Sequence, residues 1–185
     1  MKHSTLLVDA QRSALLMVDL QAGLLPVIEG AESVVAAARK LLGAAGELDI
    51  PCVFSEQYPD GLGHTEPKVI EAARHPRVVG KMHFSCVADG CLEGTAIDSA
   101  NQVVVCGTEA HVCVLQTVLD LIVAGKQVFV VADAVGSRVE ANRQLALTRM
   151  QQAGAQIVSV EMVIFEWLHV AGTDRFRQVH KAFLR

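Results

Sequence analysis

Short runs of consecutive apolar residues alternate along this chain with longer segments whose apolar residues recur at helical spacing. Strands that are apolar on both faces are typical of a parallel sheet that is covered on both sides. With helices between the strands, the pattern predicts an α/β, three-layer α/β/α fold around a six-stranded, mostly parallel, Rossmann-like sheet. The predicted strands lie at residues 14–19, 51–55, 77–80, 102–106, 127–131 and 156–160.

The segments between these runs predict the helices that cover the sheet. Apolar positions at helical spacing place a helix over residues 110–124, and Gly125 follows where a helix commonly ends. Residues 58–65 contain Pro59, Gly61 and Gly63 and are predicted to form a loop. The other predicted helical segments are 30–47, 69–74, 140–153, 162–168 and 174–184.

Length and composition limit the class of protein. A chain of 185 residues is long enough for one domain, over residues 1–185. The net charge is −4 and the Lys and Arg residues are scattered, so we expect no nucleic-acid partner. No apolar stretch reaches the ~18 residues of a membrane helix, so we expect no membrane partner. Residues 1–12 lack the pattern of a secretory leader, and a cytoplasmic location is the resulting expectation.

The cysteines are odd in number and irregularly spaced. There are five, and no two of them form a C-x-x-C pair. This argues against a disulfide framework and against a structural zinc site, so we expect no metal and no cofactor. Most of the thiols are expected to be small core residues.

Chemically potent residues follow several of the predicted strands, where ligands bind in open parallel sheets. They are Asp19, Glu56, Lys81, the segment from Gly107 to Cys113, and Asp133. Cys113 falls in the first turn of a predicted helix, where the unpaired backbone N–H groups favour a thiolate and lower a thiol pKa. The same N–H groups are placed to bind an oxyanion. The alternative interpretation is a buried structural cysteine.

Two further strand ends offer partners for this thiol. Asp19 is a candidate for the group that takes the thiol proton and returns it to a leaving group, the alternative being a helix N-cap. Lys81, otherwise a solvated surface lysine, would favour the thiolate and orient Asp19. His111 offers a competing Cys–His pair. Residues two apart on a helix face different directions, so we expect His111 to line the pocket or cap the helix instead.

Four segments in order resemble the isochorismatase-like cysteine hydrolases, from about Ser13 to the end of the chain. They are Leu-Leu-Met-Val-Asp-Leu-Gln at 15–21, Val-Gly-Lys-Met-His-Phe-Ser at 79–85, Val-Cys-Gly-Thr-Glu-Ala-His-Val-Cys-Val at 105–114 and Val-Val-Ala-Asp-Ala-Val-Gly-Ser-Arg at 130–138. Residues 55–65 and 109–116 are most similar to the isochorismatase-domain-containing branch. Each segment alone is a weak signal, and together they are specific.

The resemblance implies a catalytic triad of Asp19, Lys81 and Cys113. It also implies a cis peptide at Thr108–Glu109, which would turn the N–H of Glu109 toward an oxyanion beside that of Cys113. Self-association into a homo-oligomer is a further implication, and the apolar segment from Val163 to Leu168 is either an interface or part of the core. The residues expected to shape the substrate pocket are Gln21, Glu56, Tyr58, Leu62, His64, Phe84, His111 and Trp167, the last from either subunit.

The sequence also departs from some relatives in the family. The nicotinamidases carry an Asp-x-His metal motif after the second strand, whereas this chain has Ser-Glu-Gln-Tyr at 55–58. Nicotinamidase activity is therefore not expected. The retained cysteine favours hydrolysis of a small amide-type substrate. Vinyl-ether cleavage, as in isochorismatase itself, and a catalytically silent binding or scaffold relative are the alternatives.

Overall fold

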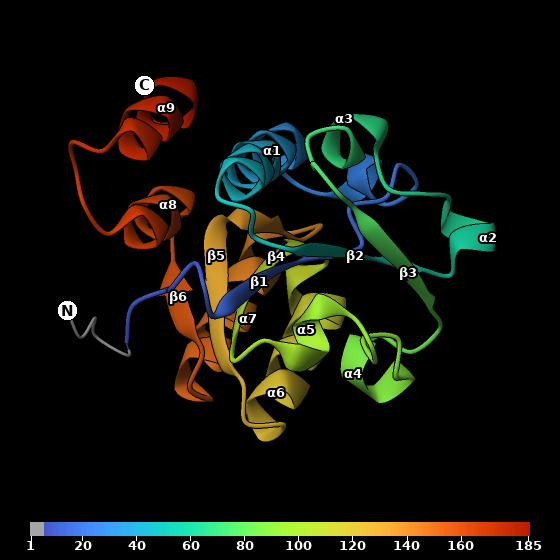
Figure 1. Ribbon diagram of the computed structural model, residues 1–185. Helices are drawn as coiled ribbons and strands as arrows, with labels where there is room; N and C mark the ends of the chain where they lie inside the picture. The colour runs from blue at the N-terminus through green and yellow to red at the C-terminus, as the bar shows by residue number, and fades with distance from the viewer. Residues whose placement is uncertain (1–5) are drawn as a thin grey trace.

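The chain forms one six-stranded sheet with the strand order β3-β2-β1-β4-β5-β6 (Figure 1). The computed structural model describes residues 6–185, so the first five residues, part of the segment searched for a leader, lie outside it. Every pairing within the sheet is parallel. The three-layer prediction is confirmed, with a sheet that is wholly parallel rather than mostly so. The strands are β1 (Ser13–Val18), β2 (Cys52–Gln57), β3 (Arg77–Lys81), β4 (Gln102–Thr108), β5 (Gln127–Gly136) and β6 (Gln156–Val158).

Helices cover both faces of this sheet, as the apolar strands require (Figure 1). One face carries α1 (Ala31–Glu47), α3 (Pro67–Ile70), α8 (Val160–Leu168) and α9 (Asp174–Phe183). The other carries α4 (Cys86–Asp89), α5 (Ala96–Ser99), the π-helical segment η2 (Ala110–Val114), α6 (Leu115–Val123) and α7 (Glu140–Gln152). The short elements η1 (Leu25–Val27) and α2 (Pro59–Leu62) lie in the connections that follow β1 and β2.

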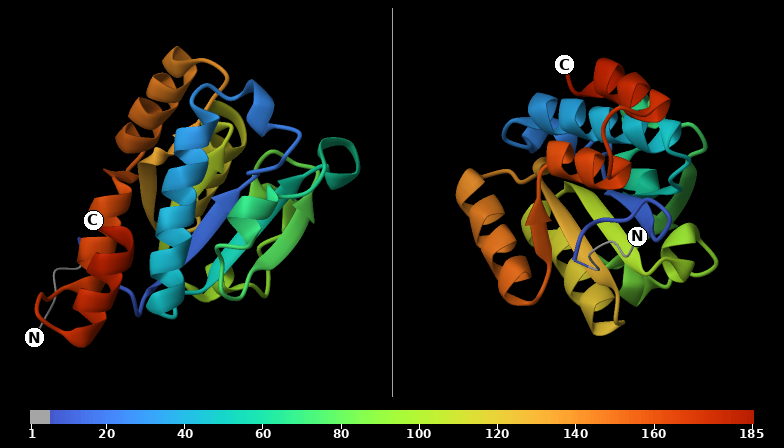
Figure 2. Two further views of the ribbon diagram at one scale, coloured as in Figure 1. Left: turned by 90° about the horizontal axis from the view of Figure 1, so that it is seen from above. Right: turned by 60° about the vertical axis from the view of Figure 1, so that its left-hand side comes forward.

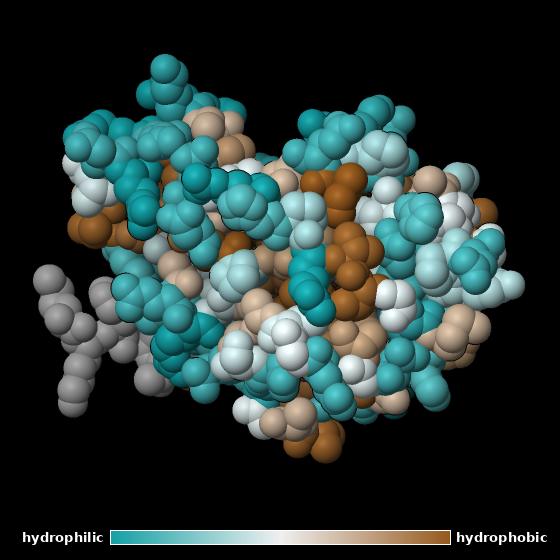
Figure 3. All heavy atoms as spheres, turned by 45° about the vertical axis from the view of Figure 1, so that its right-hand side comes forward, coloured by the Kyte–Doolittle hydropathy of each residue, from teal (hydrophilic) through white to brown (hydrophobic). Residues whose placement is uncertain are grey.

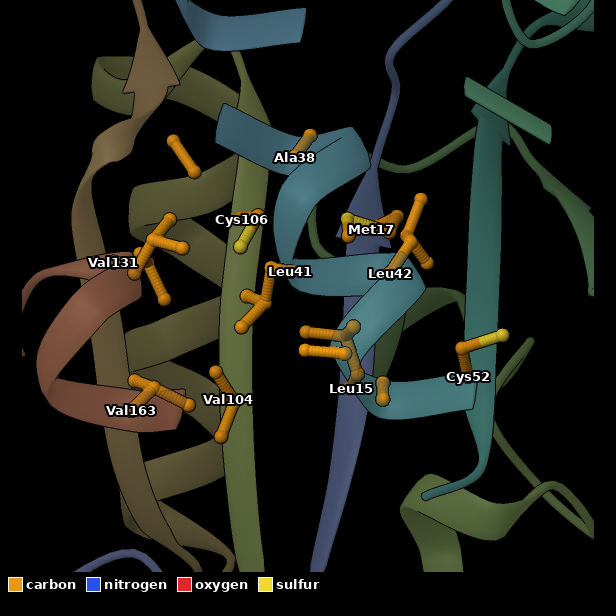
Figure 4. Close-up of a cluster of buried hydrophobic side chains, with 14 of the residues drawn as sticks. Leu15, Met17, Ala38, Leu41, Leu42, Cys52, Val104, Cys106, Val131 and Val163 are labelled. Atoms are coloured by element: carbon orange, nitrogen blue, oxygen red, sulfur yellow. The ribbon is translucent and has the colours of Figure 1, made fainter. Parts of the chain in front are cut away.

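Two apolar clusters, one on each face, hold the layers together. Leu41 and Leu42 of α1 pack over Leu15 and Met17 of β1, with Val104 of β4 beside them (Figure 4). Successive side chains of a strand point to opposite faces, so Leu16 and Val18 enter the second cluster. The C-terminal helix α9 lies along α1 at the outside of the first face (Figure 2).

Several predicted elements change their bounds in the structure. Polar residues extend β2 to Gln57, and β5 runs on to Gly136, so Asp133 lies inside β5 rather than after it. Its carboxylate accepts a hydrogen bond from the N–H of Val160 at the start of α8. The predicted loop at 58–65 contains α2, and the predicted helix at 110–124 is divided into η2 and α6. The short elements η1, α4 and α5 were missed.

The C-terminal apolar segment belongs mainly to the core. Val163 and Trp167 are buried, and the Trp167 Nε1–H donates to Ser13 Oγ at 2.9 Å. Trp167 therefore packs within its own chain, beside the start of β1, and the expectation that it walls the substrate pocket is wrong. Phe165 is the partly exposed member of this segment. Over residues 6–185, none of the helices combines the length and apolar character needed to span a bilayer.

Candidate active site

Three strand ends bring Asp19, Lys81 and Cys113 together. Asp19 directly follows β1, Lys81 ends β3, and Cys113 lies on η2 after β4. The strand order places β1 between β2 and β4, which is where the order of strands reverses and where such sheets bind ligands. Lys81 Nζ donates to Asp19 Oδ2 at 2.8 Å, and both side chains are fully buried. Both groups act on the pKa of the Cys113 thiol, which lies beside them.

Asp19 is held from several directions. Its backbone has a positive φ of 51°, which turns the chain sharply at the end of β1. Its Oδ1 accepts from Ser55 Oγ at 2.6 Å, and its carbonyl oxygen accepts from Thr108 Oγ1 at 2.6 Å. A Cβ at Gly107 would lie 2.0 Å from the carbonyl oxygen of Val18, so only glycine lets β4 approach β1 here. The carboxylate is thus fixed before any substrate arrives.

Gln57 is a member of the site that the sequence analysis missed. Its Oε1 accepts from Lys81 Nζ at 2.5 Å and from Cys113 Sγ at 3.8 Å. Its Nε2 donates to the carbonyl oxygen of Met82 at 2.8 Å, which fixes the orientation of the amide. Ser55 and Gln57 lie two apart on β2 and point to the same face, so a strand extended to residue 57 would have identified both.

The pKa of the Cys113 thiol corrects one expectation. Burial and the negative charge of Asp19 raise it well above the ordinary value, and the opposing effect of Lys81 is smaller. The position of Cys113 near a helix start predicted a lowered pKa, and that prediction is wrong for the resting site. It took account of the backbone dipoles but not of burial or of the charge of Asp19. Burial lowers the pKa of Lys81, but the charge and hydrogen bond of Asp19 outweigh it and the pKa is raised. The resting site therefore holds a thiol beside an ammonium–carboxylate pair.

The segment that precedes Cys113 carries the cis peptide bond, between Thr108 and Glu109. The carboxylate of Glu109 receives two hydrogen bonds from the guanidinium of Arg138. His111 bonds through Nδ1 to Ser137 Oγ at 3.0 Å, and its Nε2 lies 3.8 Å from Glu109 Oε2. His111 is thus engaged with the rim of the site, and its ring nitrogens contact Ser137 and Glu109 rather than the thiol, as a Cys–His pair would require.

Two predicted pocket residues hydrogen-bond to β2 and to residues 63–65 after it, and neither bonds to the thiol. Gln21 is fully buried, donates to the carbonyl oxygens of Gln57 and Gly63, and accepts from the N–H of Gln57. Glu56 accepts from the N–H and the hydroxyl of Thr65, and its second oxygen lies 3.0 Å from His64 Nδ1. Both side chains are committed to the protein itself.

The remaining predicted pocket residues lie nearer the surface. Tyr58 and Phe84 are about half exposed, and Leu62 is partly buried, with its carbonyl oxygen accepting from the N–H of Gly23. Within residues 6–185, His, Cys, Asp and Glu side chains do not gather in groups of three or more that could hold a metal ion. Glu56 and His64 bind each other and belong to no such group.

Comparison with protein families and curated proteins gives one consistent result. A model of the isochorismatase domain matches residues 13–162. The mouse isochorismatase domain-containing protein 2A is 37% identical over 171 residues, which cover 92% of this chain and 82% of that protein. The secreted isochorismatase effector Isc1 of Phytophthora sojae is 40% identical over 146 residues, covering 76% of this chain and 70% of the effector.

Solved structures agree with this result. The structure described as MAR1 ribonuclease from Caenorhabditis elegans is 36% identical, with a TM-score of 0.90 over 96% of this chain and 92% of that one. The YcaC protein of Escherichia coli is described as an octameric hydrolase of unknown specificity. It is 23% identical, with a TM-score of 0.88 over 100% of this chain and 93% of that one, and so it shares the fold. The family model supports a hydrolase-like function. The chain belongs to the isochorismatase domain family.

Proposed function

We propose that this protein is a cysteine hydrolase that cleaves the C–N bond of a small amide-type substrate at Cys113. The observation that carries the proposal is the buried contact between Lys81 Nζ and Asp19 Oδ2 with the Cys113 thiol beside it. A buried ion pair is costly, and it adds little to stability compared with apolar residues of similar size. Its position beside a thiol at the reversal of strand order indicates a catalytic use.

The first half of the reaction forms a thioester. The thiol transfers its proton to Asp19 as the sulfur attacks the amide carbonyl, and Lys81 offsets the negative charge of the sulfur. The N–H groups of Glu109 and Cys113 bind the oxyanion of the tetrahedral intermediate. Asp19 then gives the proton to the leaving nitrogen, the C–N bond breaks, and the amine departs.

The second half restores the thiol. Water attacks the thioester carbonyl while Asp19 accepts one of its protons, and the C–S bond breaks. The acid leaves, and the proton returns from Asp19 to the sulfur of Cys113. Because burial and Asp19 raise the pKa of this thiol, the sulfur is protonated at rest and ionises only as the proton moves to Asp19.

The direct test measures ammonia or amine release from a panel of small amides and carbamoyl compounds. Cys113→Ala should reduce turnover by about 10⁴-fold or more, as the loss of a nucleophile does in other covalent enzymes. Cys52→Ser is the matched control, because Cys52 is a buried thiol at the start of β2, at the other end of that strand from Gln57. Intact-protein mass spectrometry should detect the acyl group on Cys113.

Other outcomes of the same screen would overturn the proposal. Cleavage of a vinyl ether such as isochorismate that survives Cys113→Ala would assign chemistry without the thiolate. Silence on all amides, together with ligand-induced thermal shifts, would identify a binding relative. Hydrolysis of a short RNA that survives Cys113→Ala would give this chain the activity named for the Caenorhabditis elegans structure.

A second test examines the protonation state of the resting thiol. Asp19→Asn removes the negative charge that raises the pKa of Cys113, while Lys81 keeps its positive charge. Alkylation of Cys113 by iodoacetamide at pH 8 should therefore become faster in Asp19→Asn although amide turnover is lost. Slower or unchanged alkylation would contradict the raised pKa of the resting thiol.

We further propose that the chain forms a homo-oligomer. Apolar residues interrupt the hydrophilic surface on the face that is seen when the right-hand side of Figure 1 is turned toward the viewer (Figure 3). Val78 of the edge strand β3, and Met82 and Phe84 after it, are all more than 40% exposed. The molar mass in solution, measured by light scattering, should exceed the 19.8 kDa of one chain. A monomer at micromolar concentration would contradict this proposal.

A further inference from the structure

Two further thiols, those of Cys86 and Cys91, lie near the proposed catalytic groups. Cys86 begins α4, and Cys91 lies two residues after the end of that helix at Asp89. Cys91 Sγ donates to the carbonyl oxygen of Cys86 at 3.4 Å, and the two thiols shift each other's pKa in opposite directions. The proposed hydrolysis uses neither thiol.

The surroundings of Cys86 are polar for a buried cysteine. The hydroxyl of Thr117 accepts from the backbone N–H of Cys86 at 3.0 Å, and Ser55, Thr117 and Lys81 all lower the pKa of its thiol. The hydrogen bond from Cys91, together with those from Ser55 and Thr117 and the charge of Lys81, outweighs burial and lowers the pKa of Cys86. The same hydrogen bond and burial raise the pKa of Cys91. Of the two thiols, Cys86 is therefore the one that ionises more readily.

Cys86 is fully buried, so a small oxidant can reach it only through a cavity beside it. Cys86 lines a cavity of about 150 Å³ together with Gly90, Leu92, Ile97 and Leu121. Cys91 is itself partly exposed. Reactive thiols need thiolate character and access, and a second thiol within reach converts the first oxidation product into a disulfide.

We propose that Cys86 and Cys91 form a redox-active dithiol that a hydroperoxide converts into an intrachain disulfide. The Cys86 thiolate attacks one peroxide oxygen, the O–O bond breaks, and an alcohol or water leaves, so that Cys86 becomes a sulfenic acid. The Cys91 sulfur then attacks the sulfur of Cys86, the S–O bond breaks, and the hydroxyl group leaves as water with the Cys91 proton. The two thiols lose two electrons and two protons in total, and the hydroperoxide is reduced to an alcohol and water.

The oxidised pair would act on the catalytic site through Ser55. The Ser55 hydroxyl donates to Asp19 Oδ1 at 2.6 Å, and Ser55 also lowers the pKa of the Cys86 thiol. Disulfide formation removes that thiol or thiolate and leaves Ser55 with Asp19 alone. Formation of the disulfide requires no hydrolytic activity, so it can be tested whether or not the proposed function holds.

The test maps disulfides in the full chain after treatment with a modest excess of hydrogen peroxide and blocking of the remaining thiols. Trypsin and a Glu-specific protease together release residues 82–93, which contain both cysteines and none of the other three. A protease that cleaves before Asp89 then separates Cys86 from Cys91. The two fragments should stay joined until a dithiol reductant is added, whereas oxidation of the exposed Met82 adds oxygen without joining them.

Variants separate the pair from the catalytic thiol. Cys113→Ala should form the disulfide as the wild type does, and Cys52→Ser is the control for a thiol on another strand. Cys91→Ser should stop at the sulfenic acid, which dimedone captures on Cys86. Full alkylation of both thiols after peroxide treatment, or a bond between Cys86 and Cys113, would overturn the proposal.

Discussion

The two ends of the sheet differ in how deeply their ion pairs are buried. At the carboxyl ends of the strands, Lys81 and Asp19 are fully buried and bonded to each other. At the amino ends of β2 and β3, a cavity of about 310 Å³ is lined by Leu42, Ile50, Cys52, Arg74 and other residues. Its ion pair, Arg74 with Asp49, is mostly exposed, at 61% and 69% of the two side chains.

Burial of charge, more than the volume of a cavity, therefore distinguishes the proposed catalytic end of the sheet from the other end. Water screens the exposed pair, which needs no further partner. The buried pair persists because Gln57 and Ser55 satisfy its remaining hydrogen-bonding positions. Two buried charges with fixed hydrogen-bond partners are suited to proton transfer. The exposed ion pair at the amino-end cavity is not.

Breaking the buried pair should have the largest effect on stability. Lys81→Met leaves the Asp19 carboxylate buried without its cation, which should cost about 3–5 kcal/mol of unfolding free energy. Urea denaturation followed by circular dichroism measures this loss. The double variant Asp19→Asn/Lys81→Met removes both charges and should regain most of the stability. A Lys81→Met variant as stable as the wild type would show that the pair is not buried in solution.

Removing the amide that supports the pair should have the next largest effect. Gln57→Leu deletes the acceptor for Lys81 and the donor to Met82, which should cost about 1–3 kcal/mol. It should also lower kcat more than it raises KM, because Gln57 touches Lys81 and Cys113. Gln116→Leu, at an exposed position of α6, is the matched control. Equal kinetics for the two variants would remove Gln57 from the site.

The carboxylate that fastens the segment after β2 should give a smaller, pH-dependent effect. Burial raises the pKa of Glu56, but the hydrogen bonds from His64 and Thr65 outweigh it and the pKa is lowered. Its contribution is therefore complete above the ordinary pKa of 4.5 and is lost as the pH falls through the lower folded value. Between pH 5 and 3 the unfolding free energy should fall less steeply in Glu56→Gln than in wild type. Parallel curves would contradict the lowered pKa.

The exposed pair at the amino end should matter least. Arg74→Ala breaks the ion pair with Asp49, and the expected change in unfolding free energy is about 0–0.5 kcal/mol. Amide turnover should stay unchanged, because the cavity beside Arg74 contains none of the proposed catalytic groups. A loss comparable to that of Lys81→Met would reverse the contrast between the two ends.

The sheet was predictable because its apolar runs are continuous, and the ends of those runs pointed to Asp19, Lys81 and Cys113. Gln57 was missed for the same reason, since the apolar run stops at Phe54 while β2 continues through three polar residues. Those residues are buried because their partners, such as Asp19 and Thr65, come from distant parts of the chain. An apolar pattern does not reveal a strand that is stabilised by polar contacts.

The electrostatic state of the site was less predictable than its position. The sequence placed Cys113 near a helix start and Lys81 at another strand end, and both positions indicated a lowered pKa of the thiol. The sign of the shift depends on the burial of the thiol and on its distance from Asp19, 94 positions earlier in the chain. Tertiary packing also placed Trp167 against Ser13, although its apolar neighbours suited an interface equally well.

Lys81 ends β3, one of the two edge strands, which pairs with β2 alone and exposes most of its other residues. Edge strands of this kind open locally at a lower free energy than central strands. When β3 opens, Lys81 leaves Asp19 and the proposed catalytic site is dismantled while β1 and β4 stay paired. Mild heating should therefore stop turnover before the sheet melts, and the amides of β3 should exchange hydrogen faster than those of β1.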